Sequence, residues 1–310
     1  MASDKGGYER FGLTGNPFRD LSSDTIENIE LFHVKQDIDA ELESLYDDIF
    51  EKENKAVVIL TGTFGCGKTE RLLLLEHEAR KRDCFCVRKN ITPEIKWVTK
   101  GIIDGILEEA KARKVGGLFG PKWAGKLKKM AKVAESEYDP DSCGMAIADA
   151  LSTNAPAFLL LNDMHGMESL ADASRFLKTL HSMMDSIQPG VMILITSDED
   201  YLLKAIEGDT SLESRVNRWI KVPKLTDHDA AVLIGKRLLS KRLVEDLQPF
   251  YPFTEEAISS LNRYVNGNPR DLLKKADLVL DHAAKRKAIQ ISPSEVDQVL
   301  SAANEERQAQ

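Results

Sequence analysis

Apolar residues follow two alternating patterns along the chain. Between Val34 and Ile49 they recur three or four residues apart, which predicts an amphipathic helix. Elsewhere they form short continuous runs, which are typical of strands buried on both faces of a sheet. Five such runs, each separated from the next by a helical stretch, cover residues 56–60, 84–88, 158–161, 191–196 and 219–222. This alternation predicts an α/β fold, with a parallel five-stranded sheet that carries helices on both faces.

The alternation of strands and helices ends near Pro223. From Thr226 to about residue 303 the apolar spacing is helical throughout, which predicts a small all-helical domain. Residues 8–30 are rich in turn-forming residues and predict an extended arm. The sequence therefore divides into an N-terminal arm (1–33), an α/β domain (34–224) and a helical domain (225–310).

A glycine-rich loop follows the first predicted strand. It fills every fixed position of the pattern G-x-x-x-x-G-K-[ST], with the residues Gly62, Thr63, Phe64, Gly65, Cys66, Gly67, Lys68 and Thr69. Glycines let the backbone amides turn toward phosphate groups, and the N-terminus of the following helix points at the same place. Lys68 would reach the β- and γ-phosphates, and the Thr69 hydroxyl would bind Mg²⁺. We expect this loop to bind a nucleotide.

The second acidic element that such a fold requires has two possible alignments at the end of the run 158–161. In the first, Asn162 takes the place of the metal-binding aspartate and Asp163 that of the glutamate that polarises water. In the second, Asp163 binds the metal, Met164 replaces the glutamate, and Asn162 lies inside the strand. We favour the first, because a polar residue inside a doubly buried strand is costly. The glutamate is missing in both, so we expect slow hydrolysis.

The run 191–196 ends in further polar residues. In nucleotide switches a side chain at this point contacts the γ-phosphate or its attacking water, and Ser197 is our candidate. The alternative is purely structural, because Ser197 or Asp198 would also serve as the N-cap of a following helix.

Charge is distributed unevenly. The chain has 42 basic and 50 acidic residues, a net charge of −8. Residues 111–132 nevertheless contain no Asp or Glu and eight basic residues: Lys111, Arg113, Lys114, Lys122, Lys126, Lys128, Lys129 and Lys132. Trp123, Leu127 and Met130 share one helical face there. This segment suits phosphates of nucleic acid or of an anionic membrane surface, and equally a solvated surface helix that packs Trp123 on the core. Lys122, Lys126, Lys128 and Lys129 are our candidate contacts.

The cysteines do not indicate a zinc site, and the apolar runs do not indicate a membrane span. The four cysteines Cys66, Cys84, Cys86 and Cys143 lack the spacing of a zinc site and are expected to be reduced and buried. The longest apolar runs have the length of strands, too short to span a bilayer, and the first ten residues contain no apolar stretch. We therefore expect a cytoplasmic protein.

Taken together, four segments resemble the AAA+ ATPases, specifically the group of archaeal origin-recognition initiators, transposition-regulator ATPases and ExeA-type ATPases. Phe11-Gly12-Leu13 with Asn16-Pro17-Phe18 resembles the N-terminal signature of the ExeA and transposition branch, and the loop 62–69 is common to the whole group. Residues 214–223 resemble the arginine-containing element before the lid domain. Finally, residues 253–258 and Asn266-Gly267-Asn268-Pro269-Arg270 resemble the lid helix with its second sensor.

The resemblance implies ATP and Mg²⁺ as cofactors and assigns roles to two arginines. Arg270 would reach the γ-phosphate from the lid domain, and Arg215, with Arg218 as the alternative, would serve the site of a neighbouring subunit. Such an arginine implies a head-to-tail homo-oligomer, either a ring or a helical filament. In transposition regulators basic residues follow the DNA backbone, which implies the same for the lysines of 111–132.

We therefore expect an ATP-controlled oligomeric switch that hydrolyses ATP slowly and contacts double-stranded DNA without reading its sequence. The alternative is a nucleotide-gated scaffold for a protein or membrane-associated apparatus, nearly inactive in hydrolysis. In that case the basic segment would be an interfacial anchor.

Overall fold

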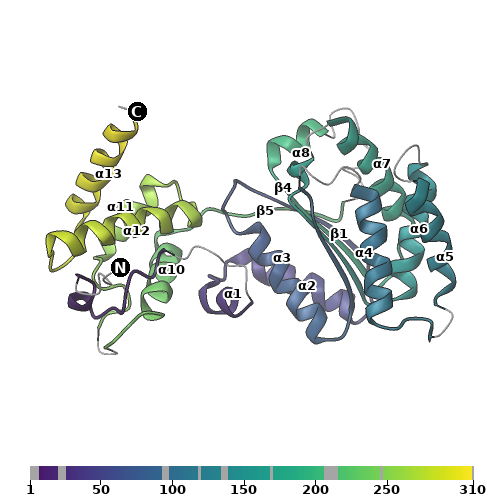
Figure 1. The fold of residues 1–310 in the computed structure, drawn as a ribbon, viewed down its shortest axis with the longest axis horizontal. Helices are drawn as coiled ribbons and strands as arrows, with labels where there is room; N and C mark the ends of the chain where they lie inside the picture. The colour runs from purple at the N-terminus through teal and green to yellow at the C-terminus, as the bar shows by residue number, and fades with distance from the viewer. Residues whose placement is uncertain are drawn as a thin grey trace. The chain divides into compact units, whose positions relative to one another are not determined.

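The computed structural model describes residues 7–19, 26–92, 98–117, 120–133, 139–167, 170–205, 216–244 and 247–308. These residues belong to two units. One contains residues 36–64 and 68–222 and holds the sheet. The other contains the N-terminal residues up to 35, residues 65–67 and the chain from Pro223 onward, and it is helical (Figure 1).

The sheet has five parallel strands in the order β2-β3-β4-β1-β5. The strands are β1 (Ala56–Thr61), β2 (Phe85–Asn90), β3 (Ala157–Asn162), β4 (Val191–Ser197) and β5 (Arg218–Lys221). Every residue of β1, β3 and β4 is buried, which explains why these strands are continuous apolar runs in the sequence. The predicted α/β fold with a five-stranded parallel sheet is confirmed.

Helices cover the sheet on both sides (Figure 1). They are α2 (Asp37–Phe50), α3 (Lys68–Lys81), α4 (Val98–Ala112), α5 (Lys122–Val133), α6 (Pro140–Thr153), α7 (Leu170–Ser186) and α8 (Glu199–Ala205), with the short 3-10 helix η4 (Met164–Gly166). Alternate strand residues such as Val57 and Leu159 share one core with α4 to α7. The residues between them face the other way, where the ring of Phe158 lies 5.2 Å from that of Phe50 in α2.

The register of β3 and β4 determines which of their polar ends meet. Phe158 pairs with Met192, and Leu161 pairs with Ile195. Continuing by one residue places Asn162 beside Thr196. Because partners in register share a face, both side chains lie on the side of Phe158, where α2 and α3 pack.

The helical unit comprises α1 (Ile26–Phe32), α10 (Asp227–Leu239), α11 (Glu255–Tyr264), α12 (Pro269–Arg286) and α13 (Pro293–Gln308), together with the 3-10 helix η2 (Glu9–Phe11). Side-chain caps fix where three of these helices begin. Thr226, Thr254 and Asn268 each accept a hydrogen bond from the backbone N–H three residues later. These caps satisfy backbone N–H groups at the starts of α10, α11 and α12.

The turn-rich segment 7–19 packs into the helical unit. Phe11, Leu13 and Phe18 are almost fully buried in the core of that unit, and the Phe18 ring meets Phe253 edge to face at 6.0 Å. The sequence signature at residues 11–18 therefore supplies core side chains that α10 to α13 do not provide.

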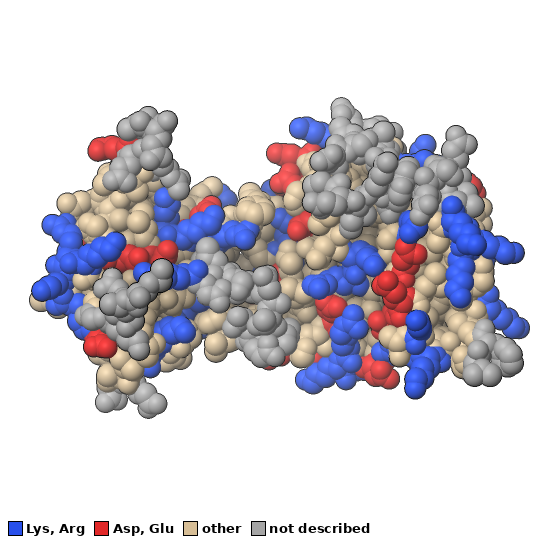
Figure 2. Space-filling model, viewed as in Figure 1, with Lys and Arg blue, Asp and Glu red and all other residues tan. Residues whose placement is uncertain are grey.

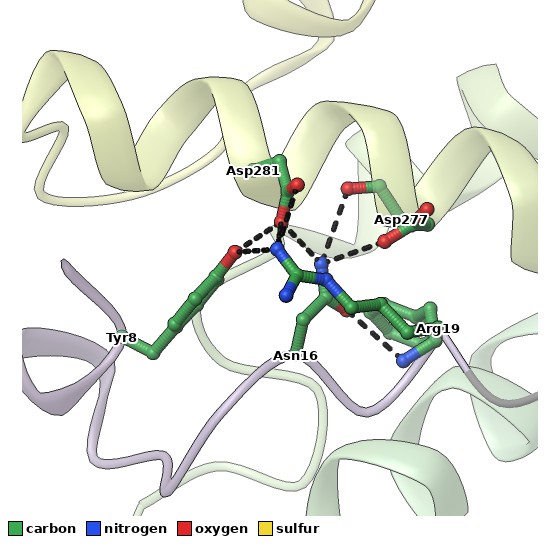
Figure 3. A network of polar contacts seen from close by, with 6 residues as sticks. Tyr8, Asn16, Arg19, Asp277 and Asp281 are labelled. Atoms are coloured by element: carbon green, nitrogen blue, oxygen red, sulfur yellow. Dashed lines mark hydrogen bonds and ion pairs between the residues drawn. The ribbon is translucent and has the colours of Figure 1, made fainter. Parts of the chain in front are cut away.

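A polar network fastens the same segment to α12 (Figure 3). The Asn16 amide donates hydrogen bonds to one carboxylate oxygen each of Asp277 (2.8 Å) and Asp281 (2.6 Å). Arg19 pairs with Asp281 at 3.1 Å, and the Tyr8 hydroxyl donates to the same carboxylate. Two acidic side chains that would otherwise repel one another across one helical turn are thereby held together by donors from the N-terminal segment.

Candidate functional site

The glycine-rich loop joins β1 to α3. Gly65 and Gly67 have φ angles of 82° and 99°, which L side chains rarely adopt, so glycine is required at both places. Lys68 is the first residue of α3 and is only 6% exposed. Its ammonium group donates hydrogen bonds to the carbonyl oxygens of Gly62 (2.7 Å) and Thr63 (3.1 Å), so it lies folded over the loop. In this geometry an anion bound at the loop would meet both the Lys68 ammonium group and the N-terminus of α3.

A hydrogen-bond network lies at the carboxyl ends of β3 and β4, next to the start of α3. The side-chain oxygen of Asn162 accepts from the hydroxyls of Thr69 (3.0 Å) and Thr196 (2.9 Å). The Asn162 amide group donates to the Asp163 carboxylate at 3.1 Å. The backbone N–H of Asp163 donates to the Thr196 hydroxyl at 2.8 Å. These four residues form a closed set of contacts, and all of them belong to the α/β unit.

Asn162 and Asp163 have different environments. Asn162 is the last residue of β3 and is 4% exposed, whereas Asp163 follows the strand, is partly exposed and has a left-handed backbone (φ 60°, ψ 57°). That conformation costs a non-glycine residue about 1–2 kcal/mol, although Asp tolerates it better than most residues. Asn162 makes the contact to the Thr69 hydroxyl that the first alignment expects. It does so from inside β3, however, where only the second alignment placed it, so the expectation that the strand is wholly apolar was wrong.

The oxygen donors at this place fit a magnesium ion. A hydroxyl, an amide oxygen and a carboxylate, from Thr69, Asn162 and Asp163, are the hard ligands that Mg²⁺ prefers. The same residues carry a single carboxylate, so they offer the ion less negative charge than an aspartate followed by a glutamate would. A bound ion would neutralise phosphate charge and orient the phosphate groups.

Ser197 does not join this network. It is the last residue of β4, fully buried, and its hydroxyl finds no hydrogen-bond partner in the described part of the chain. Thr196, the neighbour that sequence reasoning missed, points to the opposite face of the sheet and contacts both Asn162 and Asp163. Strand alternation counted from the apolar Phe158 and its partner Met192 is the signal that distinguishes the two hydroxyls.

The candidate arginines are placed as follows. Arg270 is the second residue of α12, is exposed, and comes two residues after the N-cap Asn268. Arg218 lies on β5, where its guanidinium is 3.3 Å from the Glu41 carboxylate and its side chain is 56% exposed. Arg215 lies outside the described residues.

Lysines 122 to 132 of the basic segment lie in α5, and Lys111 lies in the last turn of α4. Trp123 is 6% exposed and Leu127 is fully buried, so this face of α5 packs on the core. The opposite face carries exposed lysines, and Figure 2 shows basic side chains gathered over α5. These lysines are Lys122, Lys126, Lys128, Lys129 and Lys132. Arg113 is instead held by ion pairs with Asp83 (2.8 Å) and Glu109 (2.9 Å).

Two further features limit the chemistry of the described residues. All four cysteines are buried thiols, and burial raises the pKa of the Cys86 thiol to about 12, so this thiol is an inert core group. In the same part of the chain, no helix has an apolar stretch long enough to cross a bilayer.

Comparison with known proteins identifies the fold. No protein-family model matches the sequence, and neither does any curated protein. Among solved structures, the Aeropyrum pernix ORC2 protein, described as ADPNP-ADP complexes, has a TM-score of 0.56 at 13% identity, covering 93% of this chain and 71% of that one. The A. pernix ORC1 protein in complex with DNA has a TM-score of 0.51 at 12% identity, with 88% and 67% covered. A Thermotoga maritima RuvB mutant scores 0.51 at 15% identity, with 88% and 71% covered.

These structural neighbours are AAA+ ATPases of the origin-recognition and RuvB kinds. The chain therefore has the AAA+ fold, as its sequence motifs predict, with an α/β P-loop unit and a helical unit at its C-terminal end.

Proposed function

We propose that this chain is an ATP-binding AAA+ switch that forms oligomers, hydrolyses ATP slowly, and acts on double-stranded DNA through its phosphate backbone. The observation that carries the proposal is the P-loop, in which Lys68 lies over the loop and Thr69 contacts the end of β3. Two structural neighbours support the ligand classes, since one is described with ADPNP and ADP and another in complex with DNA.

The nucleotide would bind along Gly62–Thr69. Lys68 now donates to two loop carbonyls, and phosphate oxygens are stronger acceptors because they are charged. Mg²⁺ would be held by Thr69 and by the oxygens of Asn162 and Asp163. Because Asn162 is neutral, we expect weaker metal binding than an aspartate gives. Because the Asp163 carboxylate is one methylene shorter than the usual glutamate, we expect slow water attack.

The arginines complete the proposed switch. Arg270 would contact the γ-phosphate from the helical unit, and Arg215, with Arg218 as the alternative, would serve the site of a neighbouring subunit. Charge stabilisation by such a residue is a large part of catalysis in phosphoryl transfer. ATP would then favour a head-to-tail assembly. Lys68→Ala should abolish both ATP binding and ATP-dependent assembly, and an unchanged oligomer mass in the variant with ATP would contradict this link.

The lysine face of α5 is the proposed DNA surface. Four of its five exposed lysines are the candidate contacts, at positions 122, 126, 128 and 129, and within the described ranges no acidic side chain forms an ion pair with them. Trp123 is buried, so this helix offers DNA positive charge without an aromatic ring for base stacking. Such a surface binds backbone phosphates and reads no sequence.

Binding of a labelled random-sequence duplex across a salt series tests this surface, with ATP, with ADP and without nucleotide. If each of four lysines neutralises one phosphate, the slope of log K against log salt is about −3.6, and Lys126→Glu/Lys128→Glu reduces its magnitude by about 2. The matched control reverses Lys178 and Lys204, which are exposed on α7 and α8 of the same unit. Equal loss in the two double variants would refute a specific surface.

The same samples distinguish the alternative function. A nucleotide-gated scaffold would bind no duplex at low salt although ATP occupancy is demonstrated. Flotation with anionic vesicles then separates a membrane partner from a protein partner. Burial of Trp123 already removes the indole from a membrane anchor on α5, which favours the DNA proposal.

A further inference from the structure

Packing does not explain why position 125, inside α5, is a glycine. Glycine weakens a helix relative to alanine, because it loses more backbone freedom on folding. Two other helical glycines of the α/β unit have close neighbours: a Cβ at Gly105 would come within 2.9 Å of the Val87 side chain, and one at Gly144 within 2.5 Å of the Thr179 carbonyl oxygen. At Gly125, among the described residues, no atom outside the helix backbone and the adjoining residues lies within 4 Å of that position. Its φ angle also lies outside the left-handed region that favours glycine.

Gly125 lies at the centre of the lysine face of α5. It comes two residues after Trp123 and two before Leu127, which are both buried, and residues two apart on a helix do not share a face. The lysines that do share its face stand three or four residues away along the chain, namely Lys122, Lys128 and Lys129. The centre of the lysine face is therefore bare helix backbone, with exposed positive charge on both sides along the helix.

A bare centre suits a ligand whose own backbone carries the charge. Close approach of a ligand to the protein backbone is one of the uses of glycine, because no Cβ stands in the way. A phosphodiester strand that rests on Gly125 brings its phosphates within reach of the lysines before and after it. A side chain at the centre would hold the same strand away from the helix and lengthen those contacts.

We propose that Gly125 is the point at which a strand of the DNA backbone lies closest to α5, while the lysines around it contact the phosphates. This inference rests on the proposed DNA-binding function and adds to it a residue that carries no charge. The role of Gly125 is steric. A neutral side chain at this position therefore weakens DNA binding even though every lysine remains.

Gly125→Gln tests the proposal, because glutamine adds a long neutral side chain and favours the helix. Binding of the labelled random-sequence duplex is measured with ATP across the salt series. We expect an affinity about tenfold lower at about 0.1 M salt, and a slope of log K against log salt smaller in magnitude by about 1, which corresponds to one lost phosphate contact. Gly125→Ala, which adds only a methyl group, should lose less affinity. Both variants should unfold at a temperature higher by about 1–4 °C, because better helix formers replace glycine.

Ser174→Gln is the matched control. Ser174 is exposed on α7 of the same unit, so glutamine there extends from another helix and leaves the lysine face unchanged. Its duplex affinity should equal that of wild type. Higher stability together with weaker binding at position 125 excludes misfolding as the cause, because a damaged helix would lower both.

Each outcome has a distinct meaning. Wild-type affinity in Gly125→Gln, while Lys126→Glu/Lys128→Glu still weakens binding, would overturn the close approach and leave the DNA-binding function intact. A change in oligomer mass or in flotation with anionic vesicles, at unchanged duplex affinity, would also overturn it, because the bare backbone would then belong to a contact with a second copy or a membrane. Wild-type protein that binds no duplex in any nucleotide state at low salt would instead refute the proposed function itself, and this inference with it.

Discussion

Asn162→Asp is the most informative single change in the candidate site, because it restores the carboxylate that AAA+ resemblance leads one to expect there. In the structure the Asn162 amide donates a hydrogen bond to the Asp163 carboxylate over 3.1 Å. Aspartate would remove that donor and place a second negative charge at the same distance. We expect the variant to be less stable than wild type in the absence of metal.

The distance sets the size of the effect. Two like charges 3.1 Å apart repel by about 5 kcal/mol at an effective dielectric of about 20, and by about 1.3 kcal/mol in bulk water. Asp163 is partly exposed and Asn162 buried, so the repulsion lies between these limits, and the variant side chain can still rotate. Loss of the hydrogen bond adds about 1 kcal/mol. These two contributions together give a destabilisation of about 2–6 kcal/mol, and rotation of the variant side chain brings it toward the lower end, while the hydroxyl donors of Thr69 and Thr196 remain.

Thermal unfolding at pH 7 measures this destabilisation, with EDTA or with millimolar Mg²⁺. The variant should unfold at a clearly lower temperature in EDTA and recover with Mg²⁺, because the ion neutralises the carboxylate pair, whereas wild type should respond much less. Single-turnover hydrolysis should be faster in the variant, since the metal is held more tightly. Equal stability in EDTA, together with no gain from Mg²⁺, would show that residue 162 does not face the metal position.

Two predictions concern the helical unit. Phe18→Ala should destabilise it by about 3–5 kcal/mol, because loss of a fully buried ring packed on Phe253 leaves a cavity. Calorimetry measures this change. The control is Leu239→Ala, a 63% exposed position in the same unit, which should change the stability by less than about 0.5 kcal/mol. Burial alone would raise the pKa of Asp281, but the hydrogen bonds from Tyr8, Asn16 and Arg19 outweigh it and hold that pKa below its usual value. The stability gained from this carboxylate is therefore present above about pH 4 and is lost as the pH falls through the lowered value. Asp281→Asn should thus be destabilising at pH 7 and progressively less so toward pH 3, as followed by thermal unfolding; a constant difference across this range would contradict the role of the ion pair.

Much of the fold could be predicted because its strands are buried on both faces. The run at 158–161 has no polar residue until Asn162, and β3 ends at that residue. The buried face of α5 was equally predictable, since Trp123 and Leu127 share a helical face in the sequence and both are buried in the structure. In both places the local pattern of apolar residues carries the whole signal, as a continuous run in β3 and as helical spacing in α5.

What the local pattern could not reveal depends on contacts between distant residues. Phe11 and Phe18 lie among turn residues, and nothing near them in sequence indicates that they complete the core formed by α10 to α13. The choice between Thr196 and Ser197 likewise requires the pairing of β4 with β3, because adjacent hydroxyls on a strand face opposite sides and only the neighbour identifies the useful one. Both residues carry a hydroxyl, so residue type alone does not distinguish them.

The neutral residue at position 162 connects the architecture of the site to its proposed use. Without Mg²⁺, an aspartate there would place a second negative charge next to Asp163. The Asn162 side chain instead accepts hydrogen bonds from two hydroxyls through its oxygen and donates one to the carboxylate through its nitrogen. Both ends of the amide therefore have partners without an ion. The site is thus stable before nucleotide arrives, and the ion adds less stabilisation when it does. Under the proposed function, the smaller negative charge offered to the ion and the short carboxylate would slow hydrolysis more than they would weaken phosphate binding by the loop and Lys68. Such an imbalance would benefit the proposed switch, which has to remain in its ATP state while it is assembled on DNA.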